Sequence, residues 1–161
     1  AAFCLHLPYP KLALKGLNKI IPKDLNPENK ERLTNNFDAS ITYSRQIGNI
    51  YTGSLYLGLL SLLEQSQDLK AGDKIGFFSY GSGAVSEIFS GRLVEGYKDL
   101  LRSDRLDIFA KRQHLSVSDY EKLFYEEAQL DDTGSTQFAD YQTGAFRLAE
   151  ISEHQHIYKG N

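Results

Sequence analysis

The spacing of hydrophobic and polar residues predicts a chain of mixed α/β structure. Residues 2–6 form a short apolar run that ends at His6 and meets Pro8-Tyr9-Pro10, which is typical of a strand followed by a loop. After Pro10, apolar residues recur at helical spacing, while lysines occupy every fourth position on another side. We therefore expect His6 at the C-terminal end of a strand, with a lysine-edged helix directly after it.

Two more helices are predicted in the first half of the chain. One begins at Asn26-Pro27, where a capping side chain precedes a proline, and runs to about Arg45. The other covers residues 52–63, where apolar side chains surround nearly the whole helix, so we expect it to be buried on all sides. Neighbouring backbones would approach this helix closely at its small residues, Gly53, Ser54 and Gly58.

A pair of strands is predicted next. Residues 74–80 are an apolar strand that leads into Gly81-Ser82-Gly83, and residues 84–97 form a second extended stretch. Ser90-Gly91 predicts a bulge or bend in that second strand. We expect the two strands to pair side by side.

The C-terminal part is predicted to be more varied. Residues 98–130 are expected to be helical, with a capping box from Ser116 to Asp119. The Asp, Thr, Gly and Ser content of residues 130–140 indicates an exposed loop. Residues 145–151 alternate as a closing strand does.

Composition narrows the class of protein. A chain of 161 residues predicts one domain, or one half of a larger one, and its 41% hydrophobic and 24% charged residues are typical of a soluble globular protein. The net charge of −3 comes from interspersed charges, which argues against nucleic acid as a partner.

The same sequence argues against a membrane span and for a reducing compartment. Its longest strongly apolar stretch, 55–63, is far shorter than the roughly 20 residues that cross a bilayer. The single cysteine, Cys4, allows no internal disulfide and favours a cytoplasmic setting. Because the chain starts without methionine and inside an apolar run, we expect it to be part of a longer protein.

His6 and the lysines after it are the first candidates for chemistry. A histidine at a strand end could polarise a carbonyl or relay a proton near pH 7, with a structural role as an equal alternative. Lys11 and Lys15 lie one helical turn apart and could bind phosphate, although such a pair is usually a solvated helix face.

Asn49 and the glycine-rich turn form a second group of candidates. Asn49 precedes the apolar helix, so a turn or capping role is the simplest interpretation, while its amide could instead stabilise an oxyanion. Gly81-Ser82-Gly83 is either a tight turn or a place where backbone N–H groups reach a ligand oxygen.

The remaining candidates carry less weight. Cys4 and His6 would share one strand face, as a nucleophile and its base could, but free cysteine usually packs in a core and packing is favoured here. His154 and His156 also share a predicted strand face, yet two histidines without further ligands do not make a metal site, and His114 has no identifiable partner. We therefore expect no metal.

Three sequence blocks resemble, in order, the C-terminal half of the bacterial hydroxymethylglutaryl-CoA synthase family. They read HLPYPK at 6–11 with Lys15, GNIYTGSLY at 48–56 and IGFFSYGSG at 75–83. Residues 103–161 match the family only loosely. The resemblance implies an α/β, thiolase-like fold, with a mixed sheet packed on helices and a buried central helix. It assigns residues 1–161 to a single C-terminal domain of a longer enzyme.

The resemblance also implies a reaction. Members of the family condense acetyl-CoA with acetoacetyl-CoA to hydroxymethylglutaryl-CoA, on the mevalonate route to isoprenoids, with no metal or redox cofactor. A cysteine thiolate carries the acetyl group, a glutamate removes a methyl proton, and water releases the product. Both residues belong to the N-terminal half of the enzyme, which is absent here. We therefore expect this chain alone to be inactive and the complete enzyme to be a homodimer.

Residue roles follow from the resemblance position by position. His6 matches the histidine that positions and polarises acetoacetyl-CoA and takes part in acid–base chemistry. Cys4 does not match the nucleophile. The other matches are two lysines near the CoA moiety, Lys11 and Lys15, and substrate-binding positions at Asn49, Ser82 and the backbone of Gly81.

Two other functions are alternatives to the synthase. One is a noncatalytic acyl-CoA-binding or scaffold domain that keeps the fold without the nucleophile half. The other is a different condensing enzyme of the thiolase-like class, such as a ketoacyl synthase. The block from His6 to Lys15 disfavours the latter, because those relatives carry different histidine motifs.

Overall fold

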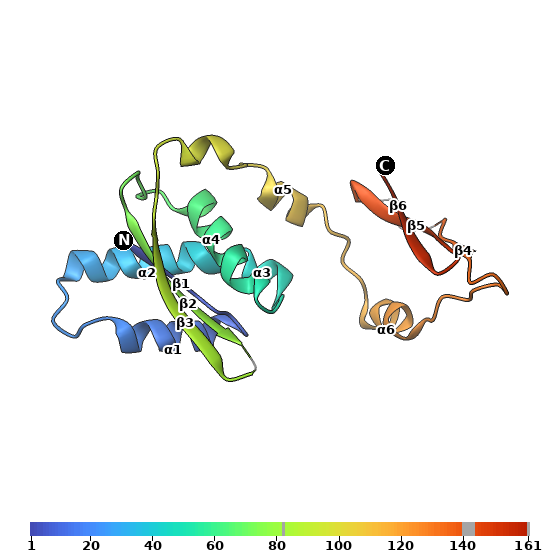
Figure 1. The fold of residues 1–161 in the computed structure, drawn as a ribbon, viewed down its shortest axis with the longest axis horizontal. Helices are drawn as coiled ribbons and strands as arrows, with labels where there is room; N and C mark the ends of the chain where they lie inside the picture. Colours follow the sequence, from blue (N-terminus) through green and yellow to red (C-terminus); the bar gives the residue numbers. More distant parts are fainter. Residues whose placement is uncertain (82, 140–143, 161) are drawn as a thin grey trace. The chain divides into compact units, whose positions relative to one another are not determined.

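The computed structural model describes residues 1–81, 83–139 and 144–160 (Figure 1). The chain divides into two compact units, Ala1–Leu106 (unit 1) and Asp107–Asn161 (unit 2). No helix among the described residues is long and apolar enough to cross a membrane. The assignment of the whole chain to a single domain stays a prediction.

Unit 1 is built on a three-stranded mixed sheet. Strand β1 (Ala2–Leu5) pairs in parallel with β2 (Lys74–Gly81), and β2 pairs antiparallel with β3 (Val85–Arg92). The predicted pairing of residues 74–80 with the extended stretch after them is confirmed by the pairing of β2 with β3. The bend predicted at Ser90-Gly91 is wrong, because the antiparallel register continues through both residues without an extra residue on either strand.

Four helices lie between β1 and β2 in the sequence; the first, second and fourth pack on this sheet, and the third packs on the fourth (Figure 1). They are α1 (Pro10–Ile20), α2 (Pro27–Ile41), α3 (Ser44–Ile47) and α4 (Gly53–Gln65). The cap predicted at Asn26 is confirmed, since its side chain accepts a hydrogen bond from the Asn29 N–H at 2.8 Å.

The helix predicted to run to Arg45 is interrupted after α2, and a separate α3 follows. The cause lies in α4, where the Ser61 hydroxyl donates to the Ala39 carbonyl at 2.6 Å and accepts from the Tyr43 N–H at 3.2 Å. In a continuous helix these two backbone groups, four residues apart, would bond to each other. A side chain from a distant helix therefore ends α2.

Helix α4 is buried along one stripe, which corrects the expectation that residues 52–63 are buried on all sides. Its buried residues are Ser54, Leu55, Gly58, Ser61 and Leu62. On another side, Tyr56 is 61% exposed. Within unit 1, α4 meets α2, α3, β1 and β2, and these elements cover only part of its apolar circumference.

Two buried clusters lie on opposite faces of β1. One cluster joins β1 and β2 to α4 through Ala2, Cys4, Leu55, Leu62, Leu69, Ile75 and Phe77. The other joins β1 to α1 and α2 through Leu5, Leu7, Ala13, Leu17, Phe37 and Ile41. Successive side chains of a strand point to opposite faces, so β1 is buried on both.

The region 98–130 is not one helix, which corrects that prediction. It holds a short 3-10 helix, η1 (Tyr97–Leu100), and two short helices, α5 (Arg105–Ala110) and α6 (Val117–Tyr125). Before α5, the Arg102 N–H donates to the Glu64 carboxylate at 3.0 Å and so leaves the helical pattern. The predicted cap at Ser116 is confirmed, since its hydroxyl accepts from the Asp119 N–H at 3.1 Å.

Unit 2 contains α6 and an antiparallel sheet of three strands. They are β4 (Thr136–Gln137), β5 (Phe146–Ser152) and β6 (Gln155–Gly160). The predicted closing strand corresponds to β5, and the described part of the predicted loop over 130–140 includes the short β4. His154 does not share a strand face with His156, because it lies in the tight turn between β5 and β6 with φ of 65°.

Candidate functional site

The residues that follow β1 and β2 meet at one edge of the sheet in unit 1, here called the carboxyl edge. Because β1 and β2 are parallel, their C-terminal ends lie side by side. His6 comes directly after β1, and Gly81 ends β2. Helix α1 begins four residues after His6, so Lys11 also lies toward this edge.

The turn that contains Asn49 lies toward the same edge. The C-terminal end of α4 is near the start of β1, since the Asn36 side chain donates to the Ala1 carbonyl and accepts from the Ser66 hydroxyl. Helix α4 therefore runs antiparallel to β1, and its first turn points toward the carboxyl edge (Figure 1). The fold thus brings the candidate segments of the sequence toward one end of unit 1.

His6 is held by backbone and ring contacts. Its N–H donates to the Phe78 carbonyl at 2.8 Å, which continues the pairing of β1 with β2. Its ring packs edge-on against Tyr80, with 6.1 Å between ring centroids. Nδ1 is enclosed and has no hydrogen-bond partner in the described part of the chain. The residue as a whole is half-buried, so part of it is open to solvent.

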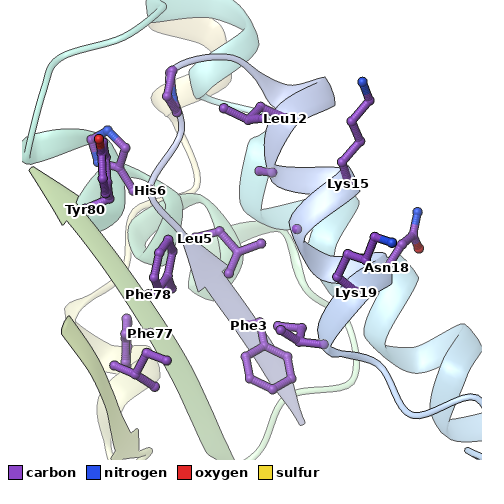
Figure 2. Close-up of a pocket in the computed structure, with 15 residues that line it drawn as sticks. Phe3, Leu5, His6, Leu12, Lys15, Asn18, Lys19, Phe77, Phe78 and Tyr80 are labelled. Atoms are coloured by element: carbon purple, nitrogen blue, oxygen red, sulfur yellow. The ribbon is translucent and has the colours of Figure 1, made fainter. Parts of the chain in front are cut away.

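A pocket of about 990 Å³ lies between α1 and the sheet, beside His6 (Figure 2). Its wall is largely apolar and includes Phe3, Leu5, Leu12, Phe77 and Phe78. His6 and Tyr80 lie together near one end of the pocket, and three polar side chains of α1 lie along another side, Lys15, Asn18 and Lys19 (Figure 2). The volume is in the range of small-molecule sites, roughly 300–1,000 Å³.

Helix α1 supplies the cations of this pocket. Lys15 and Lys19 line it, whereas Lys11 does not. Lys19 continues the four-residue spacing of Lys11 and Lys15, but this spacing alone does not distinguish it from a solvated lysine, and Asn18 has no signal beyond its helical position. The structure brings His6 and Lys15 to one pocket and leaves Lys11 exposed in the first turn of α1.

Asn49, Gly81 and Gly83 are not among the residues that line the pocket. Asn49 shapes the turn before α4, since its side-chain oxygen accepts hydrogen bonds from the Tyr51 N–H and the Ser54 hydroxyl. This is the turn role expected from the sequence. Gly81 pairs with Val85 of β3, and Ser82 lies outside the described residues. The substrate-binding roles of Asn49, Gly81 and Ser82 stay predictions.

Cys4 packs in the core, as the sequence favours. Its side chain is in the cluster between the sheet and α4, with 1% of the residue exposed. Burial raises the pKa of the Cys4 thiol to about 12, so it is a poor nucleophile near neutral pH. Among the described residues, no group of three or more His, Cys, Asp and Glu side chains is gathered as metal ligands.

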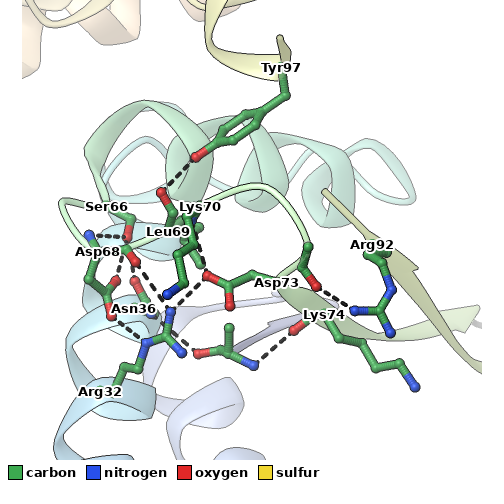
Figure 3. Close-up of polar contacts among 12 residues, drawn as sticks. Arg32, Asn36, Ser66, Asp68, Leu69, Lys70, Asp73, Lys74, Arg92 and Tyr97 are labelled. Atoms are coloured by element: carbon green, nitrogen blue, oxygen red, sulfur yellow. Dashed lines mark hydrogen bonds and ion pairs between the residues drawn. The ribbon is translucent and has the colours of Figure 1, made fainter. Parts of the chain in front are cut away.

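A polar network that the sequence analysis missed joins α2 to the loop before β2 (Figure 3). Arg32 donates to the carboxylates of Asp68 and Asp73, which lie 36 and 41 residues away in sequence. Burial alone raises the pKa of Asp73, but hydrogen bonds from the Lys70 N–H and from Arg32 more than offset it, so the pKa lies below its ordinary value. This Arg32–Asp68–Asp73 network connects α2 to the loop that leads into β2.

The chain is similar in sequence to one family of enzymes. Residues 15–129 match the family model described as hydroxymethylglutaryl-coenzyme A synthase C terminal. The chain is 47% identical over 131 residues to the hydroxymethylglutaryl-CoA synthase of Enterococcus faecalis, a match that covers 81% of this chain and 34% of that protein.

Solved structures agree with this similarity. A hydroxymethylglutaryl-CoA synthase in complex with CoA is 64% identical, with a TM-score of 0.89 over 100% of this chain and 42% of that one. A structure of MvaS in complex with 3-hydroxy-3-methylglutaryl coenzyme A is 30% identical, with a TM-score of 0.68 over 99% of this chain and 41% of that one.

The mixed sheet covered by helices, with a histidine at its carboxyl edge, places the chain in the thiolase-like class and confirms the predicted fold. Within that class, the chain belongs to the hydroxymethylglutaryl-CoA synthase family and matches its C-terminal part. It spans about a third of the length of the curated relatives it matches.

Proposed function

We propose that this chain is the acetoacetyl-CoA-binding half of a hydroxymethylglutaryl-CoA synthase. The whole enzyme condenses acetyl-CoA with acetoacetyl-CoA to give hydroxymethylglutaryl-CoA for the mevalonate route. The observation that carries this proposal is the position of His6 at the end of a largely apolar pocket, in a chain of the synthase family. An imidazole there can polarise a ketone through a hydrogen bond, and as imidazolium it can give the ketone oxygen a proton as the new carbon–carbon bond forms and return to the neutral ring.

The apolar pocket and the lysines of α1 suit a CoA thioester. Apolar walls hold the uncharged part of such a ligand, and ammonium groups attract its phosphates. Lys15 and Lys19 line the pocket, and Lys11 precedes them on the same helix. Relatives with CoA or 3-hydroxy-3-methylglutaryl coenzyme A bound support this ligand class. The reaction needs no metal or redox cofactor, since proton transfer and acyl transfer account for it.

The nucleophile of the proposed reaction belongs to another part of the enzyme. The described chain has one cysteine, and burial holds its thiol protonated. The acetylated cysteine must therefore come from another part of the enzyme, and the family resemblance assigns it, together with the general-base glutamate, to an N-terminal half. The isolated chain is then inactive, and the complete enzyme acts as a cytoplasmic homodimer.

The experiment is a condensation assay on the full-length natural protein and on residues 1–161 alone. Consumption of acetoacetyl-CoA that depends on acetyl-CoA, in the full-length protein only, is the expected result. Turnover by residues 1–161 alone would contradict the division between two halves. Binding of acetoacetyl-CoA without turnover by the folded full-length protein would favour the noncatalytic acyl-CoA-binding domain instead.

A further inference from the structure

The turn that joins α3 to α4 holds a strained backbone next to Asn49. Tyr51 has φ of 55°, a left-handed conformation that costs a non-glycine residue about 1–2 kcal/mol. The ring of Tyr51 does not hold this conformation by packing, because the residue is 81% exposed. Hydrogen bonds around Asn49 hold the turn.

These hydrogen bonds settle the orientation of the Asn49 carboxamide. Its Oδ1 accepts from the Tyr51 N–H at 2.9 Å and from the Ser54 hydroxyl at 3.0 Å. A backbone N–H is always a donor, so the carboxamide atom that faces it must be the oxygen. Nδ2 therefore points away from the turn, and it has no partner in the part of the chain that the structure describes. Asn49 is exposed, so this donor is open to a ligand.

Ser54 fixes this arrangement from the buried side of the turn. The residue is 0% exposed, and its Oγ accepts from the Ile50 N–H at 2.9 Å. Its single hydroxyl proton goes to Asn49 Oδ1. The buried Ser54 hydroxyl thus accepts one hydrogen bond, from the Ile50 N–H, and donates one, to Asn49 Oδ1. These two bonds hold the Asn49 carboxamide in one orientation.

We propose that Ser54 is a positioning residue for the condensation. By holding Asn49 Oδ1, it turns Nδ2 toward a carbonyl oxygen of the bound CoA thioester. The turn and His6 both lie toward the carboxyl edge, although Asn49 is not among the residues that line the pocket beside His6. This inference rests on the proposed function, since it names a further residue that serves the same reaction.

The test compares two serines of α4 in the full-length protein. Ser54→Ala removes the hydroxyl that holds Asn49. Ser61→Ala is the matched control, because Ser61 is also 0% exposed and its hydroxyl also bonds backbone groups, those of Ala39 and Tyr43. We expect Ser54→Ala to lower kcat about 10-fold through misplacement of the donor. Ser61→Ala should lower thermal stability to a similar extent and leave kcat within 2-fold of wild type, roughly the size of a neutral change.

A double-mutant cycle separates positioning from folding. Asn49→Asp keeps an oxygen toward the Tyr51 N–H but replaces the Nδ2 donor, so it should lower kcat about 100-fold. If Ser54 acts through that donor, Ser54→Ala has no further effect on kcat in the Asn49→Asp background. Equal fold losses in both backgrounds would overturn the inference, as would equal kcat for Ser54→Ala and Ser61→Ala.

Different experimental results would contradict the proposed function and the proposed role of Ser54. If the wild-type protein has no turnover, the proposed function fails, and calorimetric binding of acetoacetyl-CoA becomes the readout. Ser54→Ala should then weaken that binding, with Ser61→Ala unchanged. Wild-type binding that Ser54→Ala leaves intact, or no binding at all, would also overturn the role of Ser54.

Discussion

Single glycines decide how closely the elements of unit 1 pack. Gly76 of β2 lies opposite Phe3 of β1, and a Cβ at Gly76 would lie 2.5 Å from the Phe3 ring. Gly58 of α4 faces the Ser40 carbonyl oxygen, and a Cβ there would lie 3.6 Å from it, an ordinary contact distance. The two glycines therefore have opposite tolerance for a side chain.

We predict that Gly76→Ala destabilises the protein and that Gly58→Ala does not. Gly76→Ala forces the Phe3 ring to move and should lower the free energy of unfolding by about 1–3 kcal/mol. Gly58→Ala should raise it by about 0.5–1 kcal/mol, because alanine is the better helix former. Denaturant melts of both variants measure these changes. A Gly76→Ala protein as stable as wild type would show that this packing does not matter.

The sequence predicts the close contact at Gly58 but not the one at Gly76. The small residues of α4 were predicted to allow close approach, and the contact of Gly58 with α2 confirms this for one of them. The clash that keeps Gly76 a glycine depends on the parallel register of β1 and β2. That register joins segments more than 70 residues apart and leaves no local pattern in the sequence.

At the scale of elements, one buried carboxylate joins three segments of unit 1. Glu64 of α4 accepts hydrogen bonds from the Tyr43 hydroxyl, from the Arg102 N–H at 3.0 Å and from Arg105 at 2.9 Å. Only 1% of the Glu64 side chain is exposed. Burial, followed by the hydrogen bond to Glu64, raises the pKa of Tyr43 to about 12. Glu64 thus ties the start of α5 to α4.

We expect Glu64→Ala to loosen the chain around Arg102 and Arg105. The change removes one acceptor from the buried Tyr43, from the partly exposed Arg105 and from the exposed Arg102 N–H, and should cost about 3 kcal/mol. Amide hydrogen exchange should rise over residues 101–110 and stay unchanged in β5. Asp104→Ala, which removes only an exposed partner of Arg102, is the control. Unchanged exchange over 101–110 in Glu64→Ala would refute the role of this carboxylate.

The Arg32–Asp68–Asp73 network predicts that the free energy of unfolding decreases at acidic pH. In the folded protein the pKa of each aspartate lies below its ordinary value, because the hydrogen bonds from Arg32 and neighbouring groups outweigh burial. Their stabilising contribution is therefore complete above the unfolded pKa, about 4, and is lost as the pH falls through the lower folded pKa.

The measurement is the free energy of unfolding between about pH 6 and pH 2, the range over which aspartates titrate. Wild type should lose stability as the pH falls below about 4, and Arg32→Met should show a shallower loss. Arg92→Met is the control, since Arg92 donates to the Gly72 carbonyl and has no carboxylate partner among the described residues. Equal slopes of the free energy of unfolding against pH in all three proteins would show that the network does not cause the loss of stability at acidic pH.

Elements with strong local patterns could be predicted, and those set by distant partners could not. The strand before His6, the cap at Asn26 and the cap at Ser116 follow from neighbouring residues, and the structure confirms them. The break after α2 and the loss of helix near Arg102 depend on Ser61 and Glu64, whose effect appears only when α4 packs. Local sequence carries no sign of those contacts.

At the scale of the whole molecule, the candidate site is a product of topology. His6, Lys15 and Asn49 come from separate segments that parallel strands and an antiparallel helix bring toward one end of unit 1. The sequence blocks could identify the residues and the family. The pocket between α1 and the sheet, with Lys19 on its side, became visible only in three dimensions.

The proposed role of His6 on acetoacetyl-CoA is tested by the steady-state kinetics of His6→Ala in the full-length protein. His114→Ala is the matched control, because His114 is exposed and lies in unit 2. We predict that His6→Ala lowers kcat/KM for acetoacetyl-CoA about 10²–10⁴-fold, the usual contribution of a general acid, while His114→Ala leaves it unchanged. A folded His6→Ala protein with wild-type kcat/KM would contradict a role of His6 in the reaction.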